Sequence, residues 1–569
     1  MFHNPVVLRL SLLWGLIWLS LPGRSQHALP GHPVGFAGQM NLAEVTYLLP
    51  PLDLYEIEAR SGNAGDDLFK RIEFAVERPV TLSPEYSGIW FNRGDSRIWQ
   101  VRIISPGAYS LGLVFNTYRL ARGVRVFVYD PQLREVKGAF TSLNNKPSGV
   151  LPVGHLTGDE LIVEIQVPLD QDGYGELEIE SVSHAYLDLK NLSGRADCDP
   201  GTFGCSQRCM IDVNCAEGDQ WQTEKRSVVR IFTTTQYCTG VLVNNTGRDG
   251  TPFILTAEHC LNRSYYTERS VFLFNYESSS CFGDDGPKNM SIAGSDLVAV
   301  GDSIDFSLVK LSADIPVDYD PYFAGWDLNT PQYSSTVTIH HPWGDVKKIT
   351  IDANAPFIPS KPGDVPYTDL EDYHYFSYWW IKRWDLGSTE GGSSGSPLFN
   401  QDGRVIGLLS GGMARCGDSI GFDAENDRAI YDNTFNYDDY YTQLNYAWDY
   451  SPLSTASLKP WLDPMNSGVT SITGYAPSGT GPIPESGAGS FTLYPNPAGE
   501  RLFLSSDTPW NSRVRYRILN MTGSLVMSGL LDPGDQAAVD LSNLEPGIYL
   551  IHLSGDEVRD ESHQFIILR

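Results

Sequence analysis

The chain has 569 residues, of which 41% are hydrophobic and 19% charged, and this length predicts several folded domains. Its formal net charge of -28 argues against a nucleic-acid partner, since phosphate binding needs clustered Lys and Arg. Most of the carboxylates are expected to serve solubility, because their long-range attraction for cations is weak at physiological salt.

The first segment has the features of a signal peptide. Arg9 supplies a positive charge, an apolar run follows from Leu10 to Leu21, and a Pro-Gly pair ends it. This run is too short to span a membrane, so we expect cleavage near Ser25 and assign residues 1–25 to the leader. No later segment is long and apolar enough to cross a bilayer, which predicts an exported protein.

Residues 26–195 contain no cysteine and carry short alternating or apolar runs separated by turn residues. The runs are RIWQVRII, SLGLVF, VRVFVY and LIVEIQV. Such runs are typical of strands, and they predict a β-sandwich-like domain. No group of residues in this domain has the pattern of a catalytic site.

Residues 196–474 hold every cysteine and a second series of short apolar runs, which predicts an all-β barrel domain. The runs are VVRIF, TGVLV, PFILTA, VFLFNY, DFSLVKL, TVTIHH, PLF and VIGLLSGG. An even number of cysteines in an exported protein predicts disulfides, and no cluster of histidines supports the alternative of a zinc site. The cysteines are Cys198, Cys205, Cys209, Cys215, Cys238, Cys260, Cys281 and Cys416.

The last part of the chain begins with a linker at residues 475–490 that is rich in Gly, Pro and Ser. Residues 491–569 then read as a compact strand-rich module, with the runs FTLYPNPAGERLFLSS, VRYRILN, GIYLIHLSG and HQFIILR. We therefore expect an all-β protein throughout.

An amide-cleaving serine needs a base, a carboxylate that orients the base, and backbone donors for the oxyanion. The candidate base is His259 in FILTAEHC, where an apolar strand runs into a turn that Cys260 can tie down by a disulfide. His340, His341 and His374 are rival bases. The first two precede a proline at an expected strand end, which favours a structural role.

The candidate orienting carboxylate is Asp305 in GDSIDFSLVKL, because an acid directly before an apolar strand can be desolvated at the end of a rigid element. Asp302 is its rival. The candidate nucleophile is Ser394 in TEGGSSGSP, where flanking glycines permit a tight turn. The N–H groups of Gly392 and Ser394 can then converge as an oxyanion hole, whereas a flexible Gly-Ser loop is the alternative.

The order His, Asp, Ser resembles that of the chymotrypsin-like serine proteases. Eight stretches spread over roughly residues 205–474 together resemble the bacterial lysyl endopeptidase family. They are CMIDVNCAEGD, LVNNT, FILTAEHC, AGWD, IHHP, TEGGSSGSPLF, LLSGG and WLDP. The resemblance implies a chymotrypsin-like double β-barrel, and a secreted serine endopeptidase that cleaves after Lys or Arg without a metal or a cofactor.

Carried over to this chain, the resemblance makes His259 the general base, Asp305 its orienter and Ser394 the nucleophile. It also implies three disulfides, Cys209–Cys416, Cys215–Cys281 and Cys238–Cys260. Cys198 and Cys205 have no counterpart in the family pattern, and we expect them to pair with each other.

The specificity pocket is expected to be acidic. The position six residues before the nucleophile, where trypsin-like enzymes carry the pocket acid, is Ser388. In the lysyl endopeptidases the acid lies on a later strand, and Asp439 aligns with it when Trp448 is the anchor. The Gly-Arg pair of the family pattern has become Thr442-Gln443 in this chain.

Further binding residues follow from the same resemblance. Glu390 sits where the family has a second pocket acid, and such carboxylates favour Lys or Arg at the cleavage site. Ser410, Gly411 and Gly412 would bind the substrate backbone as a strand edge. The lysyl enzymes have a histidine at the position of Ser410, so arginine becomes an acceptable alternative to lysine.

Ser393 replaces the aspartate that pairs with a freed N-terminus in pancreatic-type zymogens. Propeptide removal must therefore act differently, and we expect residues 26–195 to cover or chaperone the protease. Lys190 and Arg195 stand just before the first cysteine. A pocket that accepts basic residues would let the enzyme cut its own propeptide there.

The tail, with LYPNPAGERLFL and then GIYLIHL, resembles the type A C-terminal sorting domain of type IX secretion in Bacteroidetes. This implies a partnership with the type IX machinery, and a protein that is secreted or attached to the outer-membrane surface. An ordinary Ig-like sandwich that binds substrate or matrix is the alternative for this module. For the whole chain, the alternative is a catalytically silent surface protein that binds host or matrix proteins.

Overall fold

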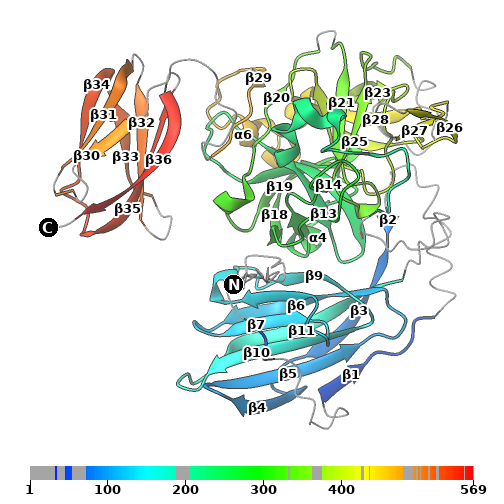
Figure 1. The fold of residues 1–569 in the computed structure, drawn as a ribbon, viewed down its shortest axis with the longest axis vertical. Helices are drawn as coiled ribbons and strands as arrows, with labels where there is room; N and C mark the ends of the chain where they lie inside the picture. Colours follow the sequence, from blue (N-terminus) through cyan, green and yellow to red (C-terminus); the bar gives the residue numbers. More distant parts are fainter. Residues whose placement is uncertain are drawn as a thin grey trace, which may run out of the picture.

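The computed structural model shows an all-β chain with few and short helices (Figure 1), which confirms the expected fold class. The expected leader, Lys190, Arg195, Cys198 and His374 lie outside the described residues. The part of the chain that the structure describes contains no helix with the length and apolar character of a membrane span. The described residues are 32–34, 45–53, 72–186, 204–330, 333–361, 375–423, 428–434, 436–477, 491–494, 498–499, 501–510, 513–520, 525–555 and 558–567.

The N-terminal domain is a sandwich of two sheets that share one core. Trp99 and Val163 from the first sheet pack in the same buried cluster as Phe115 and Val182 from the second. The first sheet has the order β1 (Thr46–Leu48), β5 (Ser96–Ile104), β10 (Glu160–Pro168), β7 (Arg125–Tyr129), β8 (Val136–Phe140), with β4 (Ile89–Arg93) beside β5. The second has the order β3 (Ala75–Leu82), β11 (Gly175–Ala185), β6 (Ser110–Leu120), β9 (Leu151–Thr157).

The central domain is built on two sheets, which we call the first and the second central sheet. The first has the order β17 (Ser291–Ala293), β16 (Val271–Leu273), β13 (Val228–Phe232), β14 (Gln236–Val243), β15 (Phe253–Thr256), β19 (Phe306–Leu311), β18 (Ser295–Gly301). A short strand from the N-terminal part of the chain, β2 (Ile72–Glu73), pairs with β14.

The second central sheet has the order β12 (Ile211–Asp212), β22 (Lys348–Asp352), β21 (Thr336–His340), β24 (Pro397–Asn400), β25 (Val405–Gly412), β20 (Trp326–Asp327), β29 (Ser471–Ile472). Beside β25 lies β28 (Asp439–Gln443), which also pairs with β23 (Tyr378–Ile381). A separate hairpin joins β26 (Ser419–Asp423) to β27 (Arg428–Tyr431).

The two central sheets are held against each other by a common apolar cluster. Leu255 and Phe306 of the first sheet pack there with Phe399 and Leu408 of the second. Each sheet also has a cluster of its own. Short helices α4 (Ser264–Glu268), α5 (Leu444–Trp448) and α6 (Lys459–Leu462) pack at the margins.

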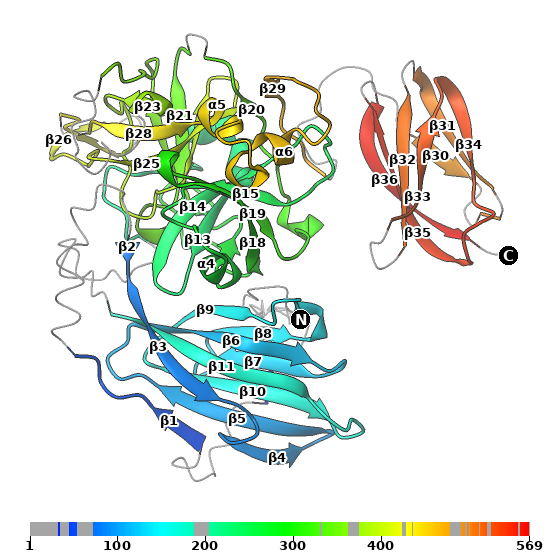
Figure 2. The ribbon, with the colours of Figure 1, turned by 180° about the vertical axis from the view of Figure 1, so that it is seen from behind.

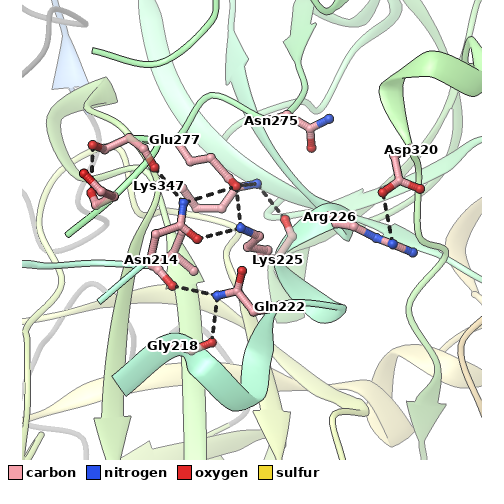
Figure 3. Close-up of polar contacts among 12 residues, drawn as sticks. Asn214, Gly218, Gln222, Lys225, Arg226, Asn275, Glu277, Asp320 and Lys347 are labelled. Carbon is pink, nitrogen blue, oxygen red and sulfur yellow. Dashed lines mark hydrogen bonds and ion pairs between the residues drawn. The ribbon is translucent and has the colours of Figure 1, made fainter. Parts of the chain in front are cut away.

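A buried ionic network also joins the two central sheets (Figure 3). Nζ of the fully buried Lys347 lies 3.1 Å from Oε2 of Glu277, and Nζ of Lys225 lies 2.6 Å from Oε1 of the same carboxylate. Burial acts to raise the pKa of Glu277, but the two ammonium groups outweigh it and hold that pKa below its ordinary value. Because Glu277 follows β16 and Lys347 precedes β22, the network fixes how the sheets meet.

The C-terminal module is a smaller pair of sheets, placed to one side of the central domain in Figures 1 and 2. Leu504 and Ile551 from the two sheets share its core. One sheet has the order β30 (Phe491–Tyr494), β31 (Arg501–Trp510), β34 (Gly534–Asp540). The other has the order β33 (Leu525–Leu531), β32 (Val514–Asn520), β35 (Gly547–Gly555), β36 (Val558–Ile567).

Candidate active site

His259 stands in the turn that follows β15 of the first central sheet. The neighbouring Cys260 forms a disulfide with Cys238 of β14, with the two Cα atoms 6.2 Å apart. The turn is therefore tied to a central strand of the sheet on one side and continuous with β15 on the other. A side chain at this position has little freedom to move.

Asp305 lies at the start of the neighbouring strand, β19. Because Thr256 of β15 pairs with Ser307 of β19, the end of one strand and the start of the other meet. Both carboxylate oxygens of Asp305 lie 3.0 Å from Nδ1 of His259, and Oδ1 also accepts a 3.1 Å hydrogen bond from the His259 backbone N–H. Asp305 is fully buried, and the His259 side chain is only 5% exposed.

Asp302, the rival acid, is exposed on the preceding 3-10 turn, η4 (Asp302–Ile304), where its carboxylate accepts from the Ser303 N–H. Asp305 ends that turn in the left-handed region, at φ 55°, which turns its side chain toward His259. A carboxylate at Nδ1 keeps the proton on that nitrogen and leaves Nε2 as the basic atom. The geometry selects Asp305 over Asp302 as the partner of His259.

Ser394 occupies a tight turn between two glycines with positive φ, Gly392 at 87° and Gly395 at 77°. No side chain fits at Gly395, because a Cβ there would lie 2.1 Å from Oγ1 of Thr256. Thr239 of β14 holds the turn twice, since its N–H donates to the Ser394 carbonyl at 2.8 Å and its hydroxyl to the Gly392 carbonyl at 2.9 Å. These contacts fix the backbone of the turn, so it is not a flexible Gly-Ser loop.

The turn of Ser394 lies directly beside the turn of His259. Sγ of Cys260 is 3.8 Å from the Ser394 carbonyl oxygen, and Ser394 is fully buried. Among the described residues, the Gly392 N–H has no hydrogen-bond acceptor. A backbone N–H that has no acceptor and lies beside the serine is the kind of donor that an oxyanion hole needs.

The rival histidines have other tasks. His340 is fully buried between the hydroxyls of Ser393, at 2.7 Å, and Thr350, at 3.0 Å. Nδ1 of His341 donates a 2.9 Å hydrogen bond to the Asp345 carbonyl, and burial lowers the pKa of His341 well below the ordinary value. Both histidines are structural parts of the wall behind the Ser394 turn.

Asp439, the expected pocket acid, is fully buried at the start of β28, opposite Gly412 of β25. Its Oδ2 accepts hydrogen bonds from Nε1 of Trp384, at 2.7 Å, and from the hydroxyl of Thr389 in the Ser394 loop. A Cβ at Gly412 would lie 2.3 Å from Oδ1. The carboxylate therefore lies where the Ser394 loop and the expected substrate-binding edge meet.

The second expected pocket acid, Glu390, is buried and has a structural contact. Its Oε2 accepts a 3.0 Å hydrogen bond from the Gln207 backbone N–H, which ties the Ser394 loop to the beginning of the central domain. Ser388 is also fully buried, and its hydroxyl faces the Thr389 carbonyl at 3.5 Å.

Ser410 joins the substrate-binding edge to the turn that carries Asp305. Its hydroxyl is 2.9 Å from Oγ1 of Thr442, and that hydroxyl donates to the Ile304 carbonyl. Gln443, the other residue that replaces the family's Gly-Arg pair, donates from Nε2 to the Tyr378 carbonyl at 2.8 Å. The role of Thr239 could not be predicted from the sequence, because a buried threonine has no local signal that separates it from other strand residues.

Three of the expected disulfides are present in the structure: Cys209–Cys416, Cys215–Cys281 and Cys238–Cys260. Cys205 is also disulfide-bonded, and its expected partner lies outside the described residues. Ligand atoms of Cys238, His259 and Cys260 come within 4.8 Å of one another. Both sulfurs belong to the same disulfide, so this group offers no thiolate to a metal ion.

The beginning of the central domain is anchored by Asp345, which is fully buried. Its Oδ1 accepts from the backbone N–H groups of Gly204, at 2.9 Å, and Val346, at 2.7 Å. Its Oδ2 accepts from the N–H and the hydroxyl of Ser206, at 3.1 Å and 2.6 Å. Every one of these donors is an internal group of the chain.

Comparison with known proteins agrees with the resemblance seen in the sequence. Residues 203–431 match the family model described as lysyl endopeptidase, C-terminal domain, and residues 492–568 match the secretion system C-terminal sorting domain. A lysyl endopeptidase of Pseudomonas aeruginosa is 27% identical over 282 residues, which are 46% of this chain and 57% of that protein. The matched part thus spans little more than half of the relative.

Two peptidases are among the solved structures that match part of this chain. Kallikrein-related peptidase 10 matches with 17% identity and a TM-score of 0.25, over 41% of this chain and 93% of its own. A Glu endopeptidase in complex with MPD matches with 16% identity and a TM-score of 0.24, over 39% and 88% of the two chains.

Proposed function

We propose that this chain, which carries a lysyl endopeptidase C-terminal domain and a C-terminal sorting domain, is a secreted serine endopeptidase that cleaves after Lys or Arg. The observation that carries the proposal is the buried contact between Asp305 and Nδ1 of His259, beside the glycine-flanked turn of Ser394. This constellation suits nucleophilic attack on an amide carbonyl.

Each group has a defined task in the proposed reaction. Oγ of Ser394 attacks the scissile carbonyl while Nε2 of His259 takes its proton, and Asp305 stabilises the imidazolium that forms. The N–H groups of Gly392 and Ser394 receive the oxyanion. His259 then gives the proton to the leaving amine, and water hydrolyses the acyl-enzyme by the same steps.

The preference for basic residues rests on Asp439. Its buried carboxylate beside Gly412 would pair with the cation of a substrate side chain that enters between β25 and the Ser394 loop. Glu390 adds negative charge to the same loop, although one of its oxygens is used by Gln207. Ser410 takes part in a hydroxyl contact with Thr442, and its small side chain leaves room for arginine as well as lysine.

The two flanking domains serve export and activation in this proposal. Residues 491–569 direct the protein to the type IX secretion machinery, consistent with a secreted or cell-surface protein. Residues 26–195 act as a propeptide that the enzyme removes by cutting after Lys190 or Arg195. A purified Ser394→Ala precursor should therefore stay uncut, and its maturation in isolation would contradict self-processing.

The experiment that tests the function is a cleavage-site profile on a mixed peptide library, with Ser394→Ala as the control. Cuts confined to Lys-X and Arg-X bonds, absent in the control, are expected. Cuts at other residues would leave a protease but remove Asp439 and Glu390 as determinants. A processed protein that neither cuts nor reacts with a fluorophosphonate would instead be a catalytically silent binding protein.

A further inference from the structure

A short strand of the N-terminal domain is part of the first central sheet. In Figures 1 and 2, β2 runs from the start of β3 toward the central domain and lies beside β14. Glu73 pairs with Gln236 and Ile72 with Tyr237, in antiparallel register. The N–H of Phe74 extends the pairing, since it donates to the Thr235 carbonyl at 2.9 Å.

Side chains reinforce this pairing. The ring of Phe74 stacks on Tyr237, with centroids 4.2 Å apart and an interplanar angle of 19°. Ile72 and Phe74 are fully buried, and Trp343 packs against the cluster that they form. The Trp343 N–H donates to the carbonyl of Gly391, at 2.7 Å, so the cluster also touches the loop that carries the nucleophile.

The position of β2 along β14 places it close to the turn of Ser394. Three contacts follow one another along one edge of β14. Val241 to Val243 pair with β15, and Thr239 holds the Ser394 carbonyl. Gln236 and Tyr237 then pair with β2. At about 3.3 Å per residue, β2 begins about 7 Å beyond the nucleophile turn on that edge. A peptide crossing Ser394 would meet β2 within two or three residues of the scissile bond.

The two sides of Ser394 are not equivalent. On one side the Gly395 N–H donates to the Leu409 carbonyl at 2.8 Å, and β25 continues from there as the edge Ser410–Gly412. Under the proposed function, this edge binds the residues that precede the scissile bond. The residues that follow it must then leave on the other side, along the edge of β14 that β2 pairs with.

Polar contacts elsewhere in the interface also hold the N-terminal domain, and with it β2, against the central domain. Arg269 donates to Glu180 through Nε, at 2.8 Å, and through Nη2, at 2.5 Å. The hydroxyl of Tyr265 donates to Glu77 at 3.0 Å. These contacts join β3 and β11 to the helix α4 region and add to the docking of the N-terminal domain in the uncut chain.

We propose that β2 is a built-in competitor that occupies the leaving-group side of the substrate cleft by strand addition to β14. The inference rests on the proposed protease function and adds its regulation. The docked N-terminal domain excludes peptides that extend beyond the scissile bond, because they need the backbone groups of Gln236 and Tyr237 for their own pairing. Substrates that end at the scissile bond do not compete with β2.

The test compares two substrates on the full chain. One is a lysyl amide of a small fluorophore, and the other is a quenched peptide with four residues after the same lysine. The uncut chain, made with Lys190→Ala and Arg195→Ala, is compared with the processed enzyme after the cut N-terminal domain has been removed from it. We expect docking to lower kcat/KM for the extended peptide about 10-fold more than it lowers kcat/KM for the amide. This ratio corresponds to the loss of about two backbone hydrogen bonds.

Two phenylalanines of the N-terminal domain provide a matched pair. In the uncut chain, Phe74→Ala should remove most of the difference between the substrates, whereas Phe127→Ala, a fully buried change inside the domain, should preserve it. Equal suppression of both substrates by docking, or equal relief by both variants, would overturn the inference. A processed enzyme that neither cleaves the amide nor takes a fluorophosphonate label would instead defeat the proposed function.

Discussion

The two central sheets hold their parts of the site by different means. In the first, His259 and Asp305 stand at the meeting ends of the paired strands β15 and β19, and a disulfide closes the histidine turn. In the second, Ser394 stands on a turn with left-handed glycines, and the carbonyls of that turn are held by Thr239 of the first sheet.

This difference shows which sheet, or which contact between the sheets, positions each group of the site. His259 and Asp305, the proposed base and its carboxylate, are organised within one sheet, so their geometry follows from local strand pairing. Ser394, the proposed nucleophile, is held by a contact between the sheets, whereas Asp439, the proposed pocket acid, accepts hydrogen bonds from Trp384 and Thr389. Substitutions should therefore separate into effects on chemistry, on selectivity, on alignment and on stability.

The largest effect is expected from Asp305→Asn in the first sheet. The amide would favour the wrong tautomer of His259, so kcat should fall about 10⁴-fold with little change in KM. Steady-state kinetics would measure this, with the exposed Asp302→Asn as the matched control. A loss below about 10-fold would show that the pair does not work as proposed.

Asp439→Asn should act on selectivity and leave the first sheet untouched. Loss of a buried charge partner should lower kcat/KM for lysyl and arginyl substrates about 10²–10³-fold, while cleavage after neutral residues changes little. The neighbouring Asp438→Asn serves as control, because that carboxylate accepts from Nε1 of Trp380 instead. Equal behaviour of the two variants would mean that the pocket acid lies elsewhere.

Thr239→Val tests the contact between the sheets. It removes the hydroxyl that donates to the Gly392 carbonyl and accepts from the His341 N–H, and it keeps the N–H that holds Ser394. We expect kcat to fall about 10-fold, the value of about two buried hydrogen bonds. Thr267→Val removes an equally buried hydroxyl from α4 and should leave kcat unchanged.

The smallest effect on activity is expected from Lys347→Met in the buried network. Removing one partner from Glu277 should lower the free energy of unfolding by about 3 kcal/mol, as measured in a denaturant titration. The activity of the folded fraction should hardly change. Lys288→Met, on an exposed ion pair, should cost at most about 0.5 kcal/mol. A large loss of kcat in Lys347→Met would show that the network aligns the site.

Much of the fold could be predicted from short apolar runs. VVRIF and VIGLLSGG coincide with β13 and β25, because β-branched and aliphatic residues between turn signals leave little choice of boundary. The pairing of β2 with β14 could not be predicted. Two residues, Ile72 and Glu73, carry no periodic signal, and their partners lie far away in the chain.

The candidate site divides in the same way. His259 and Ser394 stand in sequence motifs whose neighbouring residues predict a turn, and both residues lie in turns of the structure. The local pattern alone does not separate Asp305 from its rival Asp302, and only the family resemblance favours Asp305. The contact of Asp305 with His259 depends on a left-handed residue and on the pairing of β15 with β19. The bond from Gln207 to Glu390 depends on a long-range contact that no local pattern records.

The anchor at Asp345 bears on how cleanly the precursor must be trimmed. An enzyme whose activation needs a new terminal ammonium group tolerates one cleavage site only, since one residue more or fewer misplaces the charge. Here the buried carboxylate is already saturated by the amides of Gly204, Ser206 and Val346 and by the Ser206 hydroxyl. Ragged ends upstream of residue 204 should thus be equally active, and a preparation with mixed termini by mass spectrometry should show one specific activity.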